Sequence, residues 1–209
     1  MDLIQLACPV PRDVIIACSG GVDSMVALDF FVKGRKNIKV AHFDHGTPHA
    51  QLAKRFVESY CRDHEIELLQ SRVTRPKLDS ESPEEYWRNE RLSWLYSLPG
   101  QVITAHHLDD AVEWWIFSSL NGIGRVIPSS NKNIIRPFLW TPKEELINWS
   151  KRKKVPYIKD ESNKDVRYAR NRIRHNILPE ALKINPGLYK VVKKKLQEVS
   201  EFSGEKPVC

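Results

Sequence analysis

Short apolar runs alternate with longer amphipathic segments over the first 122 residues of the chain. Four apolar runs have the length and composition of buried strands, at 14–18, 38–43, 66–73 and 100–107. Each run is followed by a segment with helical spacing or with helix-start residues, at 25–32, 48–66, 82–98 and 108–122. Because strand and helix alternate in this way, the pattern predicts an α/β fold with a doubly wound, mainly parallel sheet and helices on both faces.

The pattern changes after Gly122. The elements predicted next are a loop, a short extended segment, a helix and a terminal helix, at 123–133, 134–140, 141–155 and 188–202. Thr141 is the predicted N-cap of the first of these helices and Pro142 its first residue. We expect a single domain over residues 1–209, in which 141–209 form a basic, helical C-terminal extension packed on the sheet.

Charge and cysteine content narrow the function classes. The chain has 33 Lys and Arg against 26 Asp and Glu, and this net charge of +7 favours a polyanionic partner. The four cysteines lie far apart without a CxxC pair, so neither a zinc knuckle nor a cysteine-held cluster is indicated. No apolar run approaches the roughly 18 residues of a membrane span, and the N-terminus lacks the features of a signal peptide. We therefore expect a cytoplasmic protein with no membrane partner.

The stretch SGGVDS, residues 19–24, joins the first predicted strand to the first predicted helix. Gly20 and Gly21 carry no Cβ, so the backbone can turn tightly and approach a ligand closely. The two serines and the free amides at the helix start point into the same small volume, which predicts a phosphate site. Asp23 is suited either to stabilise the helix start or to hold the Mg²⁺ that accompanies nucleotide phosphates.

The loop lacks the lysine of GxxxxGK[ST] and the spacing of GxGxxG, so neither a Walker-type site nor a dinucleotide site is predicted. The second predicted strand ends in HFDHG, where His42 and Asp44 either cap a helix or belong to the nucleotide pocket. Ligands of parallel sheets collect at the carboxyl ends of the strands, so we expect both residues to lie near the loop.

An acid pair begins the fourth predicted helix, in AHHLDDAVE. Asp110 and Glu113 are three residues apart on one helical face, with His106 just before the helix. Two carboxylates and an imidazole suit a divalent metal or a substrate ammonium, and we favour the ammonium over a merely solvated helix start. Trp114 and Trp115 are predicted to pack in the core rather than to stack on bases.

Basic side chains crowd the segment RYARNRIRHNILP, residues 167–179. On a helix, Arg170 and Arg174 lie one turn apart, and Asn171 and His175 share the neighbouring face. Arginine rather than lysine suits bidentate phosphate contacts, although a charge run is also typical of a solvated face.

The loop SGGVDS resembles the pyrophosphate-binding loop of the N-type ATP pyrophosphatases, the PP-loop superfamily with its adenine nucleotide alpha hydrolase-like fold. Several motifs also occur in the order seen in the tRNA(Ile)-lysidine synthetase family: SGGVDS, DHG, EEYWRNER, AHHLDDAVE, IIRPFLW, DESNKD and RNRIRHNILP. The resemblance runs from about Val14 to Pro186. Its DESN…RN.IRH…P part is specific to that family and is not a general PP-loop feature.

This resemblance implies a ligase that uses ATP, with Mg²⁺, to adenylate the C2 oxygen of cytidine 34 in an isoleucine tRNA with a CAU anticodon. Pyrophosphate leaves in that step, and the amine of lysine then displaces AMP. The implied ATP-binding residues are Ser19, Gly20, Gly21, Val22, Asp23, Ser24, His42 and Asp44, and Asp23 is the implied metal ligand. The implied catalytic residues are Asp23, Arg88, His106, Asp110 and Glu113, of which the last three hold lysine. The implied tRNA-binding residues are Arg170, Asn171, Arg172, Arg174 and His175.

Two departures from the family bear on the RNA. Family members usually carry further C-terminal domains that grip the tRNA, and they usually have threonine where this chain has Trp114. Another RNA as substrate, and a homodimer or a helper subunit, therefore stay open. So do two other functions: another PP-loop RNA-modifying enzyme such as a tRNA thiolase, and a nucleotide- or RNA-binding protein without turnover. For Arg88, contact with ATP phosphates or tRNA competes with simple ion pairing on the surface.

Overall fold

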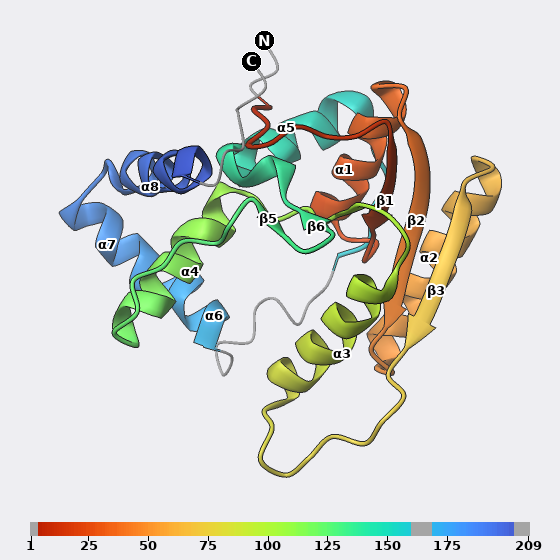
Figure 1. Ribbon diagram of the computed structural model, residues 1–209, viewed down its shortest axis with the longest axis horizontal. Helices are drawn as coiled ribbons and strands as arrows, with labels where there is room; N and C mark the ends of the chain where they lie inside the picture. The colour runs from red at the N-terminus through yellow and green to blue at the C-terminus, as the bar shows by residue number, and fades with distance from the viewer. Residues whose placement is uncertain (1–3, 160–168, 203–209) are drawn as a thin grey trace.

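Six strands form one sheet in the order β3-β2-β1-β4-β6-β5, and the neighbours are parallel except for β5 and β6 (Figure 1). The computed structural model describes residues 4–159 and 169–202 of the chain. Its strands are β1 (Asp13–Ala17), β2 (Asn37–Asp44), β3 (Glu67–Arg72), β4 (Val102–Ile103), β5 (Ser130–Asn131) and β6 (Ile134–Ile135). The predicted mainly parallel sheet is confirmed.

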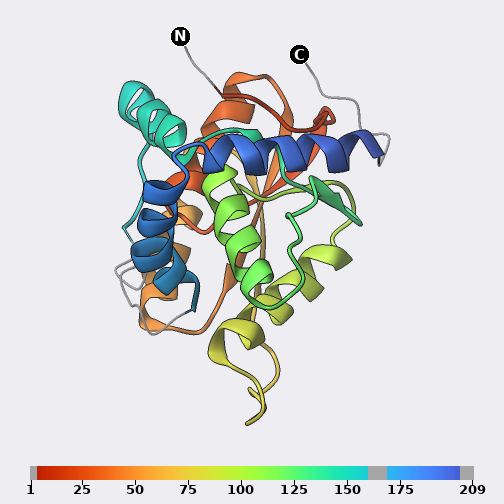
Figure 2. The ribbon, with the colours of Figure 1, turned by 90° about the vertical axis from the view of Figure 1, so that its left-hand side faces the viewer.

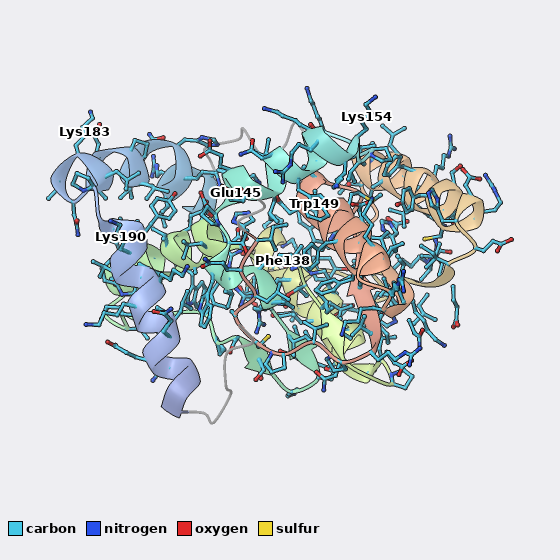
Figure 3. The ribbon with its side chains drawn as sticks, turned by 90° about the horizontal axis from the view of Figure 1, so that it is seen from above. Phe138, Glu145, Trp149, Lys154, Lys183 and Lys190 are labelled. Atoms are coloured by element: carbon cyan, nitrogen blue, oxygen red, sulfur yellow. The ribbon has the colours of Figure 1, made fainter. Side chains whose placement is uncertain are left out.

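The helices lie on both faces of this sheet, as predicted (Figure 1). They are α1 (Val22–Lys33), α2 (Pro48–Asp63), α3 (Pro83–Ser97), α4 (Leu108–Leu120), the 3₁₀ turn η1 (Pro137–Trp140), α5 (Lys143–Lys153), α6 (Ala169–Arg172), the π-helical turn η3 (Ile173–Ile177), α7 (Leu178–Ile184) and α8 (Leu188–Phe202). Alternate side chains of a strand point to opposite faces. Accordingly Val14 and Ile16 pack with α1, α2 and α5, whereas Ile15 packs with Leu95 of α3. Figure 3 shows α5, with Trp149 labelled, beside α1.

A second apolar cluster lies between α4, η1 and the C-terminal helices. Val112 of α4, Leu139 of η1 and Val192 of α8 are buried in it. Figure 2 shows α8 running across one end of α4. Helix α8 has the predicted bounds, and its contact with α4 fits the expected packing of the C-terminal segment, although the division of the chain into a domain and an extension stays a prediction.

The strand predicted at 100–107 is much shorter than expected. Val102 and Ile103 pair with Ile134 and Ile135, and beyond them the chain turns into α4. Its partner β6 is equally short because Pro137 opens η1 directly after it, so the extended segment predicted at 134–140 is extended only at its start. The loop predicted at 123–133 contains β5, which pairs antiparallel with β6.

The prediction that Thr141 caps α5 is wrong. The N-cap is Pro142, and the Thr141 hydroxyl instead accepts from the backbone N–H of Gln5 at 3.0 Å and donates to the Gln5 carbonyl at 2.8 Å. The hydroxyl is thus used to fix the N-terminal segment against the start of α5, a long-range contact that local sequence does not encode.

Among residues 4–159 and 169–202, none of the helices combines the length and the apolar character needed to cross a bilayer.

Candidate functional site

The loop between β1 and α1 has the conformation that its two glycines permit. Gly20 has a φ of +82°, and a Cβ at this position would meet Phe56 at 3.3 Å and Ile158 at 3.4 Å. Its carbonyl also accepts from the N–H of Ile158 at 3.0 Å. A side chain at this position would therefore be strained and crowded, which explains why glycine stands there.

Helix α1 begins at the loop without a side-chain cap for its first amides. Its N-cap is Gly21, which has no side chain to accept from the first-turn N–H groups. The Ser24 hydroxyl donates to the Gly21 carbonyl at 3.0 Å and accepts from the N–H of Ser19 at 3.2 Å, so it holds the turn closed. Ser19 Oγ lies 3.3 Å from Ser24 Oγ. Uncapped amides, two hydroxyls and the positive end of a helix are the features that an anion site requires.

Asp23 follows in the first turn of α1 and is bound from two distant elements. Its Oδ2 accepts from Lys143 Nζ at 3.0 Å, and His107 Nε2 lies 3.7 Å from the same oxygen. Its Oδ1 is buried and has no hydrogen-bond partner in the described part of the chain. Burial alone would raise the pKa of Asp23, but the hydrogen bonds and charges of His107 and Lys143 outweigh it and lower that pKa to about 2. Asp23 is therefore a carboxylate with one oxygen still available.

His107 links Asp23 to the acid pair and was not predicted. It is the N-cap of α4. Its ring Nδ1 accepts from the backbone N–H of Asp110 at 3.4 Å, and its backbone N–H donates to Asp110 Oδ2 at 3.0 Å. An accepting Nδ1 leaves the ring proton on Nε2, which lies 3.3 Å from Asp110 Oδ2. Burial alone would lower the pKa of His107, but Asp110 and Asp23 outweigh it and raise the pKa.

His106, the predicted histidine, lies beside this group in a different environment. Its Nδ1 is 2.8 Å from Thr104 Oγ1. Burial, opposed by Asp110 and assisted by three arginines, lowers the pKa of His106 to about 3. The two neighbouring histidines therefore differ: His106 is a neutral imidazole, and His107 is the one held between carboxylates.

Asp110 and Glu113 lie on one face of α4, as predicted, and a guanidinium group binds both. Arg174 Nε lies 2.5 Å from Glu113 Oε1, and Arg174 Nη2 lies 2.9 Å from Glu113 Oε2. Arg174 Nη2 is also 3.7 Å from Asp110 Oδ1. Burial raises the pKa of Glu113, and Arg174 opposes this effect. The acid pair thus binds a cation in the structure. Arg174 contacts these two carboxylates and does not extend from an open surface. Arg174 comes from η3, and π-helical turns are frequent at functional sites.

The other residues predicted with them lie on three elements: α3, α6 and η3. Arg88 of α3 and Arg170 of α6 each have their guanidinium carbon over the Trp114 ring, at 5.3 and 5.7 Å from its centroid. Arg172 and His175 are exposed, and Asn171 is half-buried. The DESNKD motif lies outside the described residues.

His42 and Asp44 lie at the carboxyl end of β2, and His42 is next to the loop, as expected. Asp44 accepts instead from the N–H of Gly46 at 2.7 Å and from Gln51 Nε2 at 3.0 Å. His42 Nδ1 is 2.9 Å from the carbonyl of Cys18, the residue before Ser19, and burial lowers the pKa of His42. Both side chains line a cavity of about 370 Å³, together with Gln51, Lys54, Gln70, Ser71 and Arg72. A cavity of this volume has the size of a small-molecule site.

One further carboxylate joins the starts of three helices. Asp109, next to the acid pair, accepts from the backbone N–H of Lys143 at 2.8 Å through Oδ2. Its Oδ1 accepts from the hydroxyl of Tyr189 at 3.0 Å. Asp109 thus holds α5 and α8 against the start of α4, and it fixes the backbone from which Lys143 reaches Asp23.

Fold and loop together define an ATP-using class of protein, and residues 3–181 match the family described as PP-loop domain. The chain belongs to that family, and membership implies the use of ATP. Curated relatives named tRNA(Ile)-lysidine synthase come from Aster yellows witches'-broom phytoplasma, 32% identical over 86% of this chain and 44% of the relative, and from Thermotoga sp. strain RQ2, 34% identical over 83% of this chain and 46% of the relative. A further such relative is from Lactiplantibacillus plantarum, 31% identical over 87% of this chain and 44% of the relative. The chain therefore spans less than half the length of these relatives.

Solved structures share the fold at low identity. The U34-tRNA thiolase NcsA from Methanococcus maripaludis, described with its [4Fe-4S] cluster, has a TM-score of 0.72 and 16% identity, covering 96% of this chain and 74% of that chain. The NH3-dependent NAD synthetase from Campylobacter jejuni has a TM-score of 0.51 and 15% identity, covering 96% of this chain and 90% of that chain. At such identities these similarities support the fold alone.

Proposed function

We propose that this chain is the catalytic part of a tRNA(Ile)-lysidine synthetase, which activates cytidine 34 with ATP and joins lysine to it. The observation that carries the proposal is the continuous polar line from the phosphate loop to the acid pair: Asp23, His107, Asp110 and Glu113. A site for phosphates and a site for a cation thereby lie within a few side chains of each other. The names of the curated relatives support the same reaction.

ATP would bind with its phosphates on the loop and its nucleoside towards His42 and Asp44. Gly20 and Gly21 allow the close approach, and the open amides of α1 match the negative charge. The buried, unpartnered Asp23 Oδ1 fits a hard cation such as Mg²⁺. Because the described residues contain no group of three or more His, Cys, Asp or Glu that could hold a metal ion, phosphate oxygens and water would supply the other ligands.

Lys143 supplies the cation that the loop itself lacks. Its ammonium lies 3.0 Å from Asp23 in the first turn of α1, hence beside the loop, although the two residues are 120 positions apart. A divalent ion on Asp23 would repel this ammonium, and phosphate oxygens would attract it. We infer that Lys143 contacts the phosphates when ATP is bound.

Asp110 and Glu113 would hold lysine by its α-ammonium. A carboxylate pair favours the charged form of an amine, so it would suppress the reactivity of the ε-amine if it bound that end. Arg174 already shows that the pair accepts a cation, and lysine would compete with it or bind beside it. His106, kept neutral, would contact the same substrate through the ring nitrogen not bound to Thr104.

The proposed reaction has two displacements. The C2 oxygen of cytidine forms a bond to the α-phosphorus of ATP, and the bond from that phosphorus to the pyrophosphate oxygen breaks. The ε-amine of lysine, having lost a proton to solvent, then forms a bond to C2. The C2–O bond breaks, AMP leaves with the former C2 oxygen, and the second amine proton is released.

Labelled lysine, ATP and Mg²⁺ test this proposal on an isoleucine tRNA with a CAU anticodon. Incorporation is expected for the wild-type chain and for an Asp63→Ala control, whose carboxylate is exposed on α2, and not for Asp23→Ala. Splitting of ATP to AMP and pyrophosphate without lysine incorporation would overturn the assigned substrates. The absence of both ATP splitting and lysine incorporation would overturn the enzyme assignment. A sulfur donor in place of lysine tests the thiolase alternative, for which the buried Cys8, Cys18 and Cys61 offer no support.

A further inference from the structure

Trp114 does not pack in the apolar clusters, contrary to the prediction, whereas Trp115 packs against the second cluster. The half-buried ring of Trp114 lies between elements far apart in the sequence. The guanidinium carbon of Arg88 in α3 is 5.3 Å, and that of Arg170 in α6 is 5.7 Å, from the centroid of this ring. Phe117, one turn further along α4, is 5.7 Å from it in a tilted arrangement. Trp114 of α4 and the guanidinium groups that reach it from α3 and α6 thus form one wall, which we call the aromatic wall. Figure 1 shows the three helices.

This wall carries more positive charge than the two stacked arginines. Burial lowers the pKa of Arg91 to about 10, and the charges of Arg170 and Arg88 add to that effect, so the three lie close enough to repel one another. Arg136, which is buried, also acts on neighbouring His106. Among the side chains that the structure describes, which do not include Glu84, no carboxylate forms an ion pair with any of these four arginines. Such a concentration of guanidinium groups favours a ligand that brings negative charge.

The wall adjoins the proposed reaction site. Trp114 is four residues after Asp110, so both lie on one face of α4 about one turn, or roughly 5 Å, apart. The phosphate loop lies beside the start of α4, the acid pair is in the first turns of this helix, and Trp114 follows the acid pair. A nucleotide on Trp114 would therefore be a near neighbour of the reacting cytidine.

We propose that Trp114, Arg88 and Arg170 form a binding site for one unpaired nucleotide of the RNA, with the base stacked on the indole ring and the guanidinium groups on its phosphates. The inference deepens the proposed function and rests on RNA being the substrate. Aromatic rings stack on any base, and arginine binds phosphate in a bidentate manner, so this combination fits single-stranded nucleic acid better than a protein partner. An arginine that turns from the ring to a phosphate exposes the ring face that the base covers.

The resemblance described above implies threonine at this position, and threonine offers no surface for stacking. The competing interpretation is purely structural: the two arginines on Trp114 would hold α3 and α6 against α4 by cation–π contacts.

Binding of a fluorescein-labelled anticodon stem-loop RNA with a CAU loop separates these interpretations. Fluorescence anisotropy is measured for the full chain, for Trp114→Leu, for Trp114→Phe, and for Trp87→Leu as a matched control at a half-buried tryptophan of α3. Stacking on one base is worth about 1–3 kcal/mol, so Trp114→Leu should weaken binding about 5- to 150-fold, and Trp114→Phe should regain most of it. Trp87→Leu should bind as the wild type does.

A series of probes with one abasic loop position each identifies the stacked base. One position should cost the wild-type chain about 10-fold in affinity and cost Trp114→Leu nothing. Equal binding by wild type and Trp114→Leu, equal losses in the leucine and phenylalanine variants, or no binding by the wild type would overturn the inference. Thermal unfolding of each variant shows whether a loss of affinity reflects a weakened fold. If Trp114→Leu is weakened in this way, the abasic probes are compared on Trp114→Phe, which should still lose affinity at the one stacked position. Lysine incorporation is scored separately, so failure of the proposed function and failure of this RNA contact are different results.

Discussion

Replacing Lys143 by methionine keeps the length and apolar stem of the side chain and removes its charge. Two effects are expected: weaker ATP binding, because the phosphates lose a cation, and lower stability, because Asp23 loses a hydrogen-bonding partner at 3.0 Å. The first effect follows from the role that we propose for Lys143. The second follows from the contact itself and does not depend on that role.

The size of each effect can be worked out. A fall in the pKa of Asp23 from 3.8 to about 2 corresponds to roughly 2 kcal/mol of stabilisation of its charged form. His107 and Lys143 share this amount, and the Asp23 and Lys143 side chains are 30% and 34% exposed, so solvent screening leaves about 1 kcal/mol for Lys143. A charge-assisted hydrogen bond to phosphate is worth about 1.5–3 kcal/mol, or about 10- to 150-fold in the affinity for ATP.

The stability effect has a defined pH dependence. The pKa of Asp23 is lower in the folded chain than in the unfolded chain, so its stabilisation is complete above about pH 4 and is lost as the pH falls through about 2. Without Lys143 this pKa rises, and the difference between wild type and variant should be present at pH 7 and shrink between about pH 4 and 2. Urea unfolding at several pH values measures this difference.

Calorimetric titration with ATP and with pyrophosphate measures the binding effect. Lys151→Met is the matched control, since Lys151 is an exposed lysine at the other end of the same helix, and it should bind both ligands normally. Lys143→Arg should retain most of the affinity. If Lys143→Met binds ATP and pyrophosphate as tightly as the control does, the phosphate role of Lys143 is wrong, whatever happens to stability.

Three further changes test other parts of the structure. Gly20→Ala should cost about 1–2 kcal/mol in urea unfolding, because alanine is strained at a φ of +82°, and it should abolish ATP binding; normal ATP binding would contradict the described loop. Trp149→Phe removes the 2.7 Å hydrogen bond from the indole Nε1 to buried Asp29 and should cost about 1–3 kcal/mol, whereas an unchanged unfolding midpoint would mean that this bond contributes nothing. Nα-acetyl-lysine, which lacks the α-ammonium, should not be incorporated even at high concentration, and its efficient use would show that Asp110 and Glu113 do not hold that group.

The parts of the fold and site that depend on local sequence were predictable. The alternation of apolar runs predicted the parallel sheet, and SGGVDS predicted the tight turn into α1, because glycines and serines act there through their own backbone and hydroxyls. The binding of phosphate by this loop stays a prediction. The spacing of Asp110 and Glu113 placed both on one face of α4, since helical geometry alone determines this.

Long-range contacts were not predictable. Lys143 joins the site from a helix 120 residues after Asp23, and no local pattern marks a lysine at the start of a helix as a partner of a distant carboxylate. His107 carried a signal that was missed: three residues before Asp110, it has the spacing of a capping box, which favours it over His106 as the residue at the helix start. Trp114 was assigned to the core by residue type, and only the arrival of arginines from α3 and α6 gives it another environment.

The double contact of Asp109 sets the minimum length of a working fragment. The family match ends at residue 181, so a shortened version designed from it would lack Tyr189 and with it one of the two donors to Asp109. It would also lack Leu188, Val192 and Leu196, which are buried against α4. The backbone that carries Lys143 would then be held less firmly, and the apolar side of α4 would be open to water. A fragment made for crystallisation, or for fusion to a foreign RNA-binding module, should therefore retain the whole of α8 and be joined beyond it.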